Sequence, residues 1–314
     1  MEEWTKTAAR RKKRALVRKT AWQNRALYGM ILPALIYVGI FHYAPMYGVQ
    51  IAFKNFTLGK GILGSPWAGW KWFDYFFSSP KFQTVVVNTI SISLYSLLVG
   101  FPMPILLALM MHNVAGRKFV RTVQTITYMP HFISVVVLVG MMSCFFSINS
   151  GFINTMIEAF GGSRKYFMGE PKYFIHLYVW SGVWHGVGWG SILYMAALTG
   201  VSPELHEAAM IDGASKIKRI WHIEIPALVP TIVIMLIMNV GSIMSVGFDK
   251  VYLMQNSLNI SVSETISTYN YKMGLEGTKY SFSAAIGLFN NVINFALLSI
   301  VNFLAKRISG SSLW

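Results

Sequence analysis

Six long stretches without a charged residue constrain this sequence more than any other feature. Each lacks Asp, Glu, Lys and Arg over 18 or more residues, and they cover 26–53, 82–116, 122–157, 173–203, 225–248 and 280–305. A charged side chain at the centre of a membrane helix costs roughly 2.5–3.5 kcal/mol, and a helix needs about 20 apolar residues to cross the bilayer. We therefore predict six transmembrane helices, over 28–47, 84–111, 123–146, 174–198, 228–248 and 281–304.

The composition favours an all-α integral membrane protein over the alternatives. Hydrophobic residues make up 54% of the chain and charged residues 12%, whereas soluble domains carry about 25% charged residues. The apolar stretches are continuous, and barrel strands would instead alternate over about 10 residues. The first stretch exceeds the roughly 7–15 apolar residues of a cleaved signal peptide, so we expect it to remain as the first helix. The single cysteine, Cys144, excludes a disulfide framework.

The distribution of basic residues predicts how the chain crosses the membrane. With six spans, both termini, the 112–122 loop and the 199–227 loop share one side, which holds 17 of the 27 Lys and Arg residues. The positive-inside rule makes this side cytoplasmic. The tail, residues 1–27, contributes most of this excess. With Trp4 and Trp22 it is compatible with nucleic-acid binding, but a topology signal resting on anionic lipid is favoured, so we expect no nucleic-acid partner.

These expectations divide the chain into four parts. They are a basic cytoplasmic tail (1–27), a first transmembrane helix with an aromatic-rich external loop (28–83), a five-helix core that includes the 199–227 loop (84–305), and a short cytoplasmic C-terminus (306–314). The charge-free stretch 251–263 is too short to cross a membrane, so we predict an external loop there.

The cytoplasmic loop between the fourth and fifth spans is the most informative segment. Ser202 is a good N-cap, and Pro203 suits the first helical position. Gly213 suits a helix that ends in a sharp turn. We predict a short helix of about three turns from residue 203, a second short helix over 215–223, and the start of the next span at Pro226.

The same loop carries a family pattern. It reads Glu-Ala-Ala at 207–209, Gly-Ala at 213–214 and Ile-Glu-Ile-Pro at 223–226. This resembles the EAA loop in permease subunits of binding-protein-dependent (type I) ABC importers, with Ile225 in place of the usual leucine. The aromatic-rich stretch 67–89 resembles the beginning of the permease core in that family. The first span with its aromatic loop, and the Ser-Gly-Ser-Ser-Leu-Trp end, resemble the branch that imports oligosaccharides such as aldouronates.

The resemblance implies a transport subunit with no catalytic activity of its own. It implies a second permease subunit, two cytosolic ATPase subunits, an extracytoplasmic solute-binding protein, the lipid bilayer of the bacterial cell membrane and an oligosaccharide cargo; a non-sugar solute stays open. No cofactor is expected in this chain, because ATP and Mg²⁺ would bind the ATPase. The implied ATPase-coupling residues are Glu207, Ala208, Ala209, Asp212, Gly213, Ala214 and Pro226.

Polar and aromatic residues within the spans are the candidates for a substrate path. Gly182, Gly186 and Gly190 form a small-residue stripe suited to close helix packing. Trp180 and Trp184, on the opposite face, would meet either a cavity or the membrane interface. Intramembrane amides and hydroxyls would either bind sugar hydroxyls or join helices. The candidate path residues are Tyr95, Trp184, Asn239, Ser245, Asn290 and Asn294.

Motifs for other functions are missing from the sequence. It has no Gly-x-x-x-x-Gly-Lys-Ser/Thr phosphate loop, no Gly-x-Ser-x-Gly elbow, and no histidine pair with metal-ligand spacing. A membrane-embedded enzyme acting on lipid-linked sugars would need acidic or metal-binding groups near a membrane face. An ion-coupled carrier would need an intramembrane carboxylate or a broken helix. Neither alternative explains the 199–227 loop.

Overall fold

The computed structural model describes residues 20, 22–310 and 312–313, and it divides the chain into two compact units. The first unit is Met1–Gly69 and the second is Trp70–Trp314. The regular structure of the described residues is helical, apart from one isolated β-bridge between Lys54 and Trp67. The all-α prediction is therefore confirmed for this part of the chain.

The first unit is a long apolar helix followed by a short closed loop. The helix runs through α2 (Arg25–Val38), a π-helical turn η1 (Gly39–Tyr43), α3 (Ala44–Met46) and a 3-10 turn η2 (Tyr47–Phe53). No side chain of α2 is buried within the chain, and beyond Arg25 its surface is almost entirely apolar, which is stable only in an apolar environment. The Lys54–Trp67 bridge closes the following loop, which contains α4 (Gly61–Gly64).

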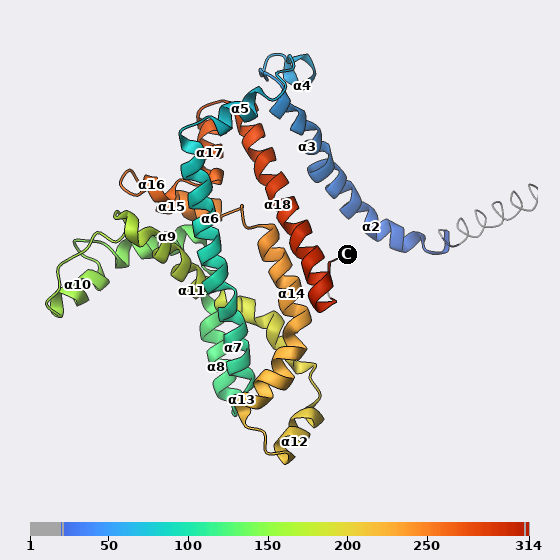
Figure 1. Ribbon diagram of the computed structural model, residues 1–314, viewed down its shortest axis with the longest axis vertical. Helices are drawn as coiled ribbons and strands as arrows, with labels where there is room; N and C mark the ends of the chain where they lie inside the picture. The colour runs from blue at the N-terminus through green and yellow to red at the C-terminus, as the bar shows by residue number, and fades with distance from the viewer. Residues whose placement is uncertain (1–19, 21, 311, 314) are drawn as a thin grey trace, which may run out of the picture. The chain divides into compact units, whose positions relative to one another are not determined.

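The second unit is a bundle of helices (Figure 1). Near its beginning, α6 and α7 run on through Phe101 and agree with the predicted helix 84–111. Later, α11 and α18 agree with the helices predicted over 174–198 and 281–304. The bounds of these four helices, and of three shorter helices of the same unit, are α5 (Lys71–Phe77), α6 (Lys81–Gly100), α7 (Pro102–His112), α10 (Phe152–Ala159), α11 (Pro171–Thr199), α17 (Ile266–Tyr271) and α18 (Tyr280–Ser309).

The prediction of one helix over 123–146 is wrong. The segment forms α8 (Arg117–Tyr128) with a 3-10 turn η3 (Met129–Phe132), and then α9 (Val135–Phe145), and the two parts are bent by 100°. The cause is local: Pro130 lies in the turn, and Ser134 begins a new helix by accepting a hydrogen bond from the Val137 amide. A charge-free run therefore does not guarantee a continuous helix.

The predicted helix over 228–248 is displaced toward the N-terminus. A continuous helix runs from Lys216 to Gly241, through α13 (Lys216–Arg219), a π-helical turn η4 (Ile220–Glu224) and α14 (Ile225–Gly241). The separate short helix predicted over 215–223 is therefore wrong, because that segment is the first part of this long helix. Residues 242–247 are not helical, and α15 (Phe248–Met254) follows them.

The external loop predicted over 251–263 is only partly irregular. It contains the end of α15 and a short helix, α16 (Ile260–Ser263). Asn256 and Asn259 both donate side-chain hydrogen bonds to the carbonyl of Met168, at 2.8 Å and 3.1 Å. The polar residues that indicated a loop thus fasten this segment to the chain that precedes α11.

Length and hydropathy alone do not reproduce the predicted count of six spans. In the described residues, four helical segments are long and apolar enough to cross a membrane: Arg25–Phe53, Lys81–His112, Lys216–Gly241 and Tyr280–Arg307. The bent pair α8–η3 and α9 makes a fifth if it is one span. The 29-residue α11 is not among them, because its glycines, histidines and tryptophans lower its mean hydropathy.

Three apolar clusters hold the second unit together, and α11 takes part in two of them. One cluster joins α6, α9, α11 and α15. A second joins α5, α6, α17 and α18, and a third joins α7, α11 and α14. At Gly188 of α11, an added Cβ would lie 2.1 Å from the carbonyl oxygen of Thr127 in α8, so the two backbones are in close contact. Small residues that permit such contact are typical of helix packing in membranes.

Candidate functional site

A short helix, α12 (Pro203–Ile211), lies at one end of the second unit (Figure 1). The predicted N-cap is present: the Ser202 hydroxyl accepts a hydrogen bond from the amide of Glu204 at 3.3 Å. At the other end, Gly213 has a φ of +74°, in the left-handed region that favours glycine. The amide of Ala214 closes the turn by donating to the carbonyl of Ala209 at 2.8 Å. The predicted short helix and sharp turn are thus confirmed.

The outer surface of α12 is exposed and partly apolar. Leu205 is 55% exposed and Ile211 is 86% exposed. Exposed large apolar side chains on a short polar loop are typical of a protein contact surface. Most of the residues predicted to couple to an ATPase share this exposure: Glu207, Ala208, Asp212, Gly213 and Pro226 are exposed, and Ala209 and Ala214 are half-buried.

The inner side of α12 faces the end of α7 and the first half of the helix Lys216–Gly241. His206 faces His112 at the end of α7, with ring centroids 6.1 Å apart. Glu224 is only 1% exposed, and its two carboxylate oxygens accept hydrogen bonds from Asn113 at 3.0 Å and 2.8 Å. The sequence interpretation assigned no role to these residues, because they come from distant segments and match no spacing motif.

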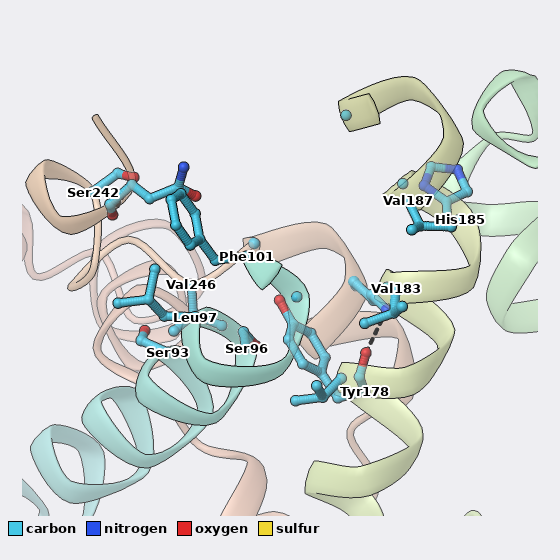
Figure 2. A pocket seen from close by; sticks show the side chains of 18 of the residues that line it. Ser93, Ser96, Leu97, Phe101, Tyr178, Val183, His185, Val187, Ser242 and Val246 are labelled. Atoms are coloured by element: carbon cyan, nitrogen blue, oxygen red, sulfur yellow. Dashed lines mark hydrogen bonds between the residues drawn. The ribbon is translucent and has the colours of Figure 1, made fainter. Parts of the chain in front are cut away.

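A cavity of about 510 Å³ lies deeper in the bundle. It is lined by α6, the beginning of α7, α9, α11, α14, the non-helical segment after α14 and the beginning of α15. Figure 2 shows Ser93, Ser96 and Phe101 on one side, with Tyr178 and Val183 across the space. Hydroxyl, amide and aromatic groups therefore line one space, which is what binding a sugar requires.

The predicted path residues do not all line this cavity. Asn239 and Ser245 do. Asn294 instead supports the cavity wall, because it accepts a hydrogen bond from the amide of Met244 and donates one to the hydroxyl of Ser245, both at 2.9 Å. It thereby satisfies the backbone amide of Met244 in the non-helical segment that follows α14. Asn290 lies in a different cavity, lined by α17 and α18 among other segments.

The two remaining path residues lie on the other side of α11. The hydroxyl of Tyr95 lies 3.0 Å from Nδ1 of His176 and accepts a hydrogen bond from the indole of Trp180 at 3.2 Å. Trp184 and Trp180 line a separate cavity of about 430 Å³ whose walls are mainly apolar and aromatic. Helix α11 therefore has a lined cavity on each of two faces. The prediction that Gly182, Gly186 and Gly190 serve close helix packing is wrong in the main, because all three line the larger cavity and an added Cβ at Gly186 would meet no atom within 4 Å.

Lys250 is the cavity residue that the sequence interpretation missed. It is 9% exposed, and its ammonium group donates to the carbonyl of Tyr178 at 2.7 Å and lies 4.6 Å from that ring's centroid. Among the described residues it forms no ion pair with a carboxylate. The available signal was a lysine two residues after a charge-free stretch, but Asp249 and Lys250 together indicate only the end of a span.

A helical membrane fold with a short exposed helix at one end agrees with the transport permease that the loop pattern predicts. The profile of the family described as "Binding-protein-dependent transport system inner membrane component" matches residues 100–310, so the chain belongs to this family. Two Bacillus subtilis (strain 168) relatives are 39% identical: "Protein LplB", with 93% of this chain and 92% of the relative covered, and "Polygalacturonan/rhamnogalacturonan transport system permease protein YteP", with 95% and 92% covered.

Solved structures agree with this assignment. A chain of a bacterial ABC transporter involved in the import of the acidic polysaccharide alginate superposes with a TM-score of 0.87 at 38% identity, covering 93% of this chain and 99% of that one. The alginate transporter in complex with an alginate pentasaccharide-bound periplasmic protein gives the same TM-score at 37% identity, covering 94% and 99%. The type I ABC permease fold expected from the loop motif is thereby confirmed.

Proposed function

We propose that this chain forms half of the translocation path of an ATP-driven oligosaccharide importer and that α12 is the part that a separate ATPase subunit moves. The observation that carries this proposal is the capped, exposed helix Pro203–Ile211, which ends on a left-handed Gly213 and presents Glu207 outward. The permease itself has no catalytic role, and ATP and Mg²⁺ bind the partner ATPases.

A short connection joins α12 to a membrane helix, so a movement of α12 can reach the membrane. Only the turn at 212–215 separates α12 from the continuous helix Lys216–Gly241. A displacement of α12 by a closing ATPase therefore reaches α14, and with it the cavity residue Asn239. Two conformations that bind the ATPase and the substrate differently are sufficient for alternating access.

The proposed topology has six crossings with both termini in the cytoplasm of a bacterial cell. Helix α11 is the crossing that hydropathy misses, since 29 residues extend about 44 Å. Its packing against α6, α7, α8 and α14 supports this, because a helix enclosed by others tolerates glycine and polar residues. The same proposal makes 1–27 and 306–314 cytoplasmic, 28–83 a first helix with an external loop, and 84–305 the core.

The proposed cargo is an oligosaccharide that carries carboxylates, delivered by an extracytoplasmic binding protein to this chain and a second permease subunit. Lys250 supports the acidic character, since a buried ammonium group lining the cavity with no ion-pair partner among the described residues attracts an anion. Relatives described as transporting polygalacturonan and alginate agree with this chemistry. A neutral oligosaccharide or a non-sugar solute is the alternative.

The Glu207→Lys variant tests the coupling role of α12. Reversing this exposed charge removes its pairing with a basic group of the ATPase, so we expect uptake to fall at least tenfold while the amount of permease in the membrane stays unchanged. Uptake by cells and substrate-stimulated ATP hydrolysis by the reconstituted complex measure the effect. The Glu204→Lys variant, an equal charge change in the first turn of the same helix, is the matched control. Normal uptake by Glu207→Lys would contradict the proposal.

A further inference from the structure

Two histidines and a buried glutamate converge where α12 meets the rest of the bundle. His112 ends α7, His206 lies in α12, and Glu224 ends η4. One ligand atom from each lies within 4.8 Å of the other two. Three elements that are far apart in the sequence thus present imidazole nitrogens and a carboxylate oxygen to one point.

The bonding state of these side chains indicates a missing partner. Glu224 is 1% exposed and forms no ion pair with a described Lys or Arg; its hydrogen-bond partner is the neutral amide of Asn113. Nε2 of His206 is buried and has no hydrogen-bond partner. A buried anion without a cation and a buried ring nitrogen without a partner are each unfavourable. A single cation that accepts lone pairs from all three side chains removes both deficits.

We propose that His112, His206 and Glu224 bind one divalent transition-metal ion, with Zn²⁺ as the preferred ion. Two imidazoles and one carboxylate are a ligand set that Zn²⁺ uses when a fourth position is left to water. Bonds of about 2.0–2.1 Å hold tetrahedral ligand atoms about 3.3 Å apart, so modest side-chain rotations close the observed spacing. Asn113 orients the Glu224 carboxylate, because its amide nitrogen lies 3.0 Å and 2.8 Å from the two oxygens, and lone pairs remain on both oxygens for the metal.

The metal would fasten α12 to the end of α7 and to the long helix Lys216–Gly241. Its ligands join α12 to α7 and to the long helix Lys216–Gly241, so the short helix and the membrane helix behind it would move as one body. This consequence rests on the proposed coupling function. Metal binding itself does not, because it depends only on the three side chains of this chain.

Cobalt binding by the full-length permease tests the site. The protein is purified in detergent through a tag without histidines, treated with a chelator and titrated with Co²⁺, whose visible absorption reports four-coordinate binding. We expect one equivalent to bind and Zn²⁺ to displace it. The variants His206→Gln and Glu224→Gln should each weaken binding at least tenfold. The matched control is His222→Gln, because His222 lies two residues from Glu224 in the same helix but its Nδ1 is 2.9 Å from the carbonyl of Lys218.

Hydrogen exchange gives a second readout on the same samples. Zn²⁺ should slow amide exchange in α12 of the unaltered protein and of His222→Gln, and it should leave His206→Gln unchanged. The proposal is overturned if the unaltered permease binds no Co²⁺, or if His206→Gln and Glu224→Gln bind it as tightly as the unaltered protein does. This result is separable from the proposed function, because Glu207→Lys leaves all three ligands in place.

Discussion

At the scale of single residues, Lys250 is the side chain that most narrows the choice of cargo. It lines the cavity, and the neutral carbonyl and ring of Tyr178 are its polar contacts. A neutral sugar would gain little from a buried ammonium group, whereas a uronate carboxylate would form a charge-assisted hydrogen bond worth about 1.5–3 kcal/mol. Lys250 therefore supports the proposal that the cargo is an acidic sugar.

Replacing Lys250 by methionine tests whether this lysine contacts a carboxylate of the cargo. The change keeps a long apolar stem and removes the charge, so we expect uptake of a labelled oligogalacturonate to fall about tenfold or more, the factor that about 1.4 kcal/mol produces. Lys250→Arg keeps the charge and should retain at least half of the uptake. Membrane levels of all variants are compared by immunoblot. Unchanged uptake by Lys250→Met would exclude the lysine as a carboxylate contact.

The sequence predicted which residue types lie in the membrane but not which of them share a cavity. Asn239 and Ser245 line the cavity, whereas Asn294 holds the wall behind them and Asn290 belongs to another space. The difference depends on where α14 ends, which hydropathy does not reveal. An amide that binds sugar and an amide that satisfies free backbone groups are indistinguishable in the sequence.

At the scale of elements, the turn after α12 decides whether the loop can transmit force. Its backbone is held at Gly213 by a left-handed conformation and by the bond from the Ala214 amide to the Ala209 carbonyl. An added Cβ at this position would meet no atom within 4 Å, so a substitution acts through backbone conformation alone. A substitution at Gly213 therefore tests the turn without introducing a steric clash at Cβ.

The Gly213→Val variant should uncouple the permease. A non-glycine residue in the left-handed region costs roughly 1–2 kcal/mol, and a β-branched side chain fits it worst. We expect uptake and co-purification of the ATPase to fall at least tenfold. Gly213→Asn is the control, because asparagine tolerates this conformation, and it should keep most of the activity. A fully active valine variant would show that the tight turn is dispensable.

The helices with clear ends were predicted well, and the broken ones were not. The two ends of α12 were predicted from Ser202 at its N-cap and Gly213 at its turn, because each of these residues acts through its immediate neighbours in the chain. Two breaks fall within uniformly apolar sequence: the bend between α8 and α9, and the end of α14 at Gly241. The length of a charge-free run does not reveal where a helix within it bends or ends. Pro130 and Ser134 were the local features that marked the bend.

At the scale of the whole molecule, every proposed role depends on which side of the membrane α12 occupies. The charge asymmetry that predicts the cytoplasmic side comes mainly from residues 1–19, which lie outside the described residues. The family assignment supports an inner-membrane location without fixing the orientation of the termini. A direct measurement of sidedness is therefore the test that bears on both the coupling helix and the six-span topology.

Cysteine labelling provides that measurement, because Cys144 is the only cysteine of the chain. In a Cys144→Ala background, the Asp212→Cys variant places a thiol beside α12, and Ser163→Cys places one in the exposed segment before α11. In the proposed topology four spans lie between a cytoplasmic N-terminus and α12, and three lie before residue 163. A membrane-impermeant maleimide should therefore label the Ser163→Cys variant in intact cells. It should label the Asp212→Cys variant only in inside-out vesicles, since one span separates the two positions. Labelling of Asp212→Cys in intact cells would put α12 outside, beyond the reach of a cytosolic ATPase, and both the coupling proposal and the topology would fail together.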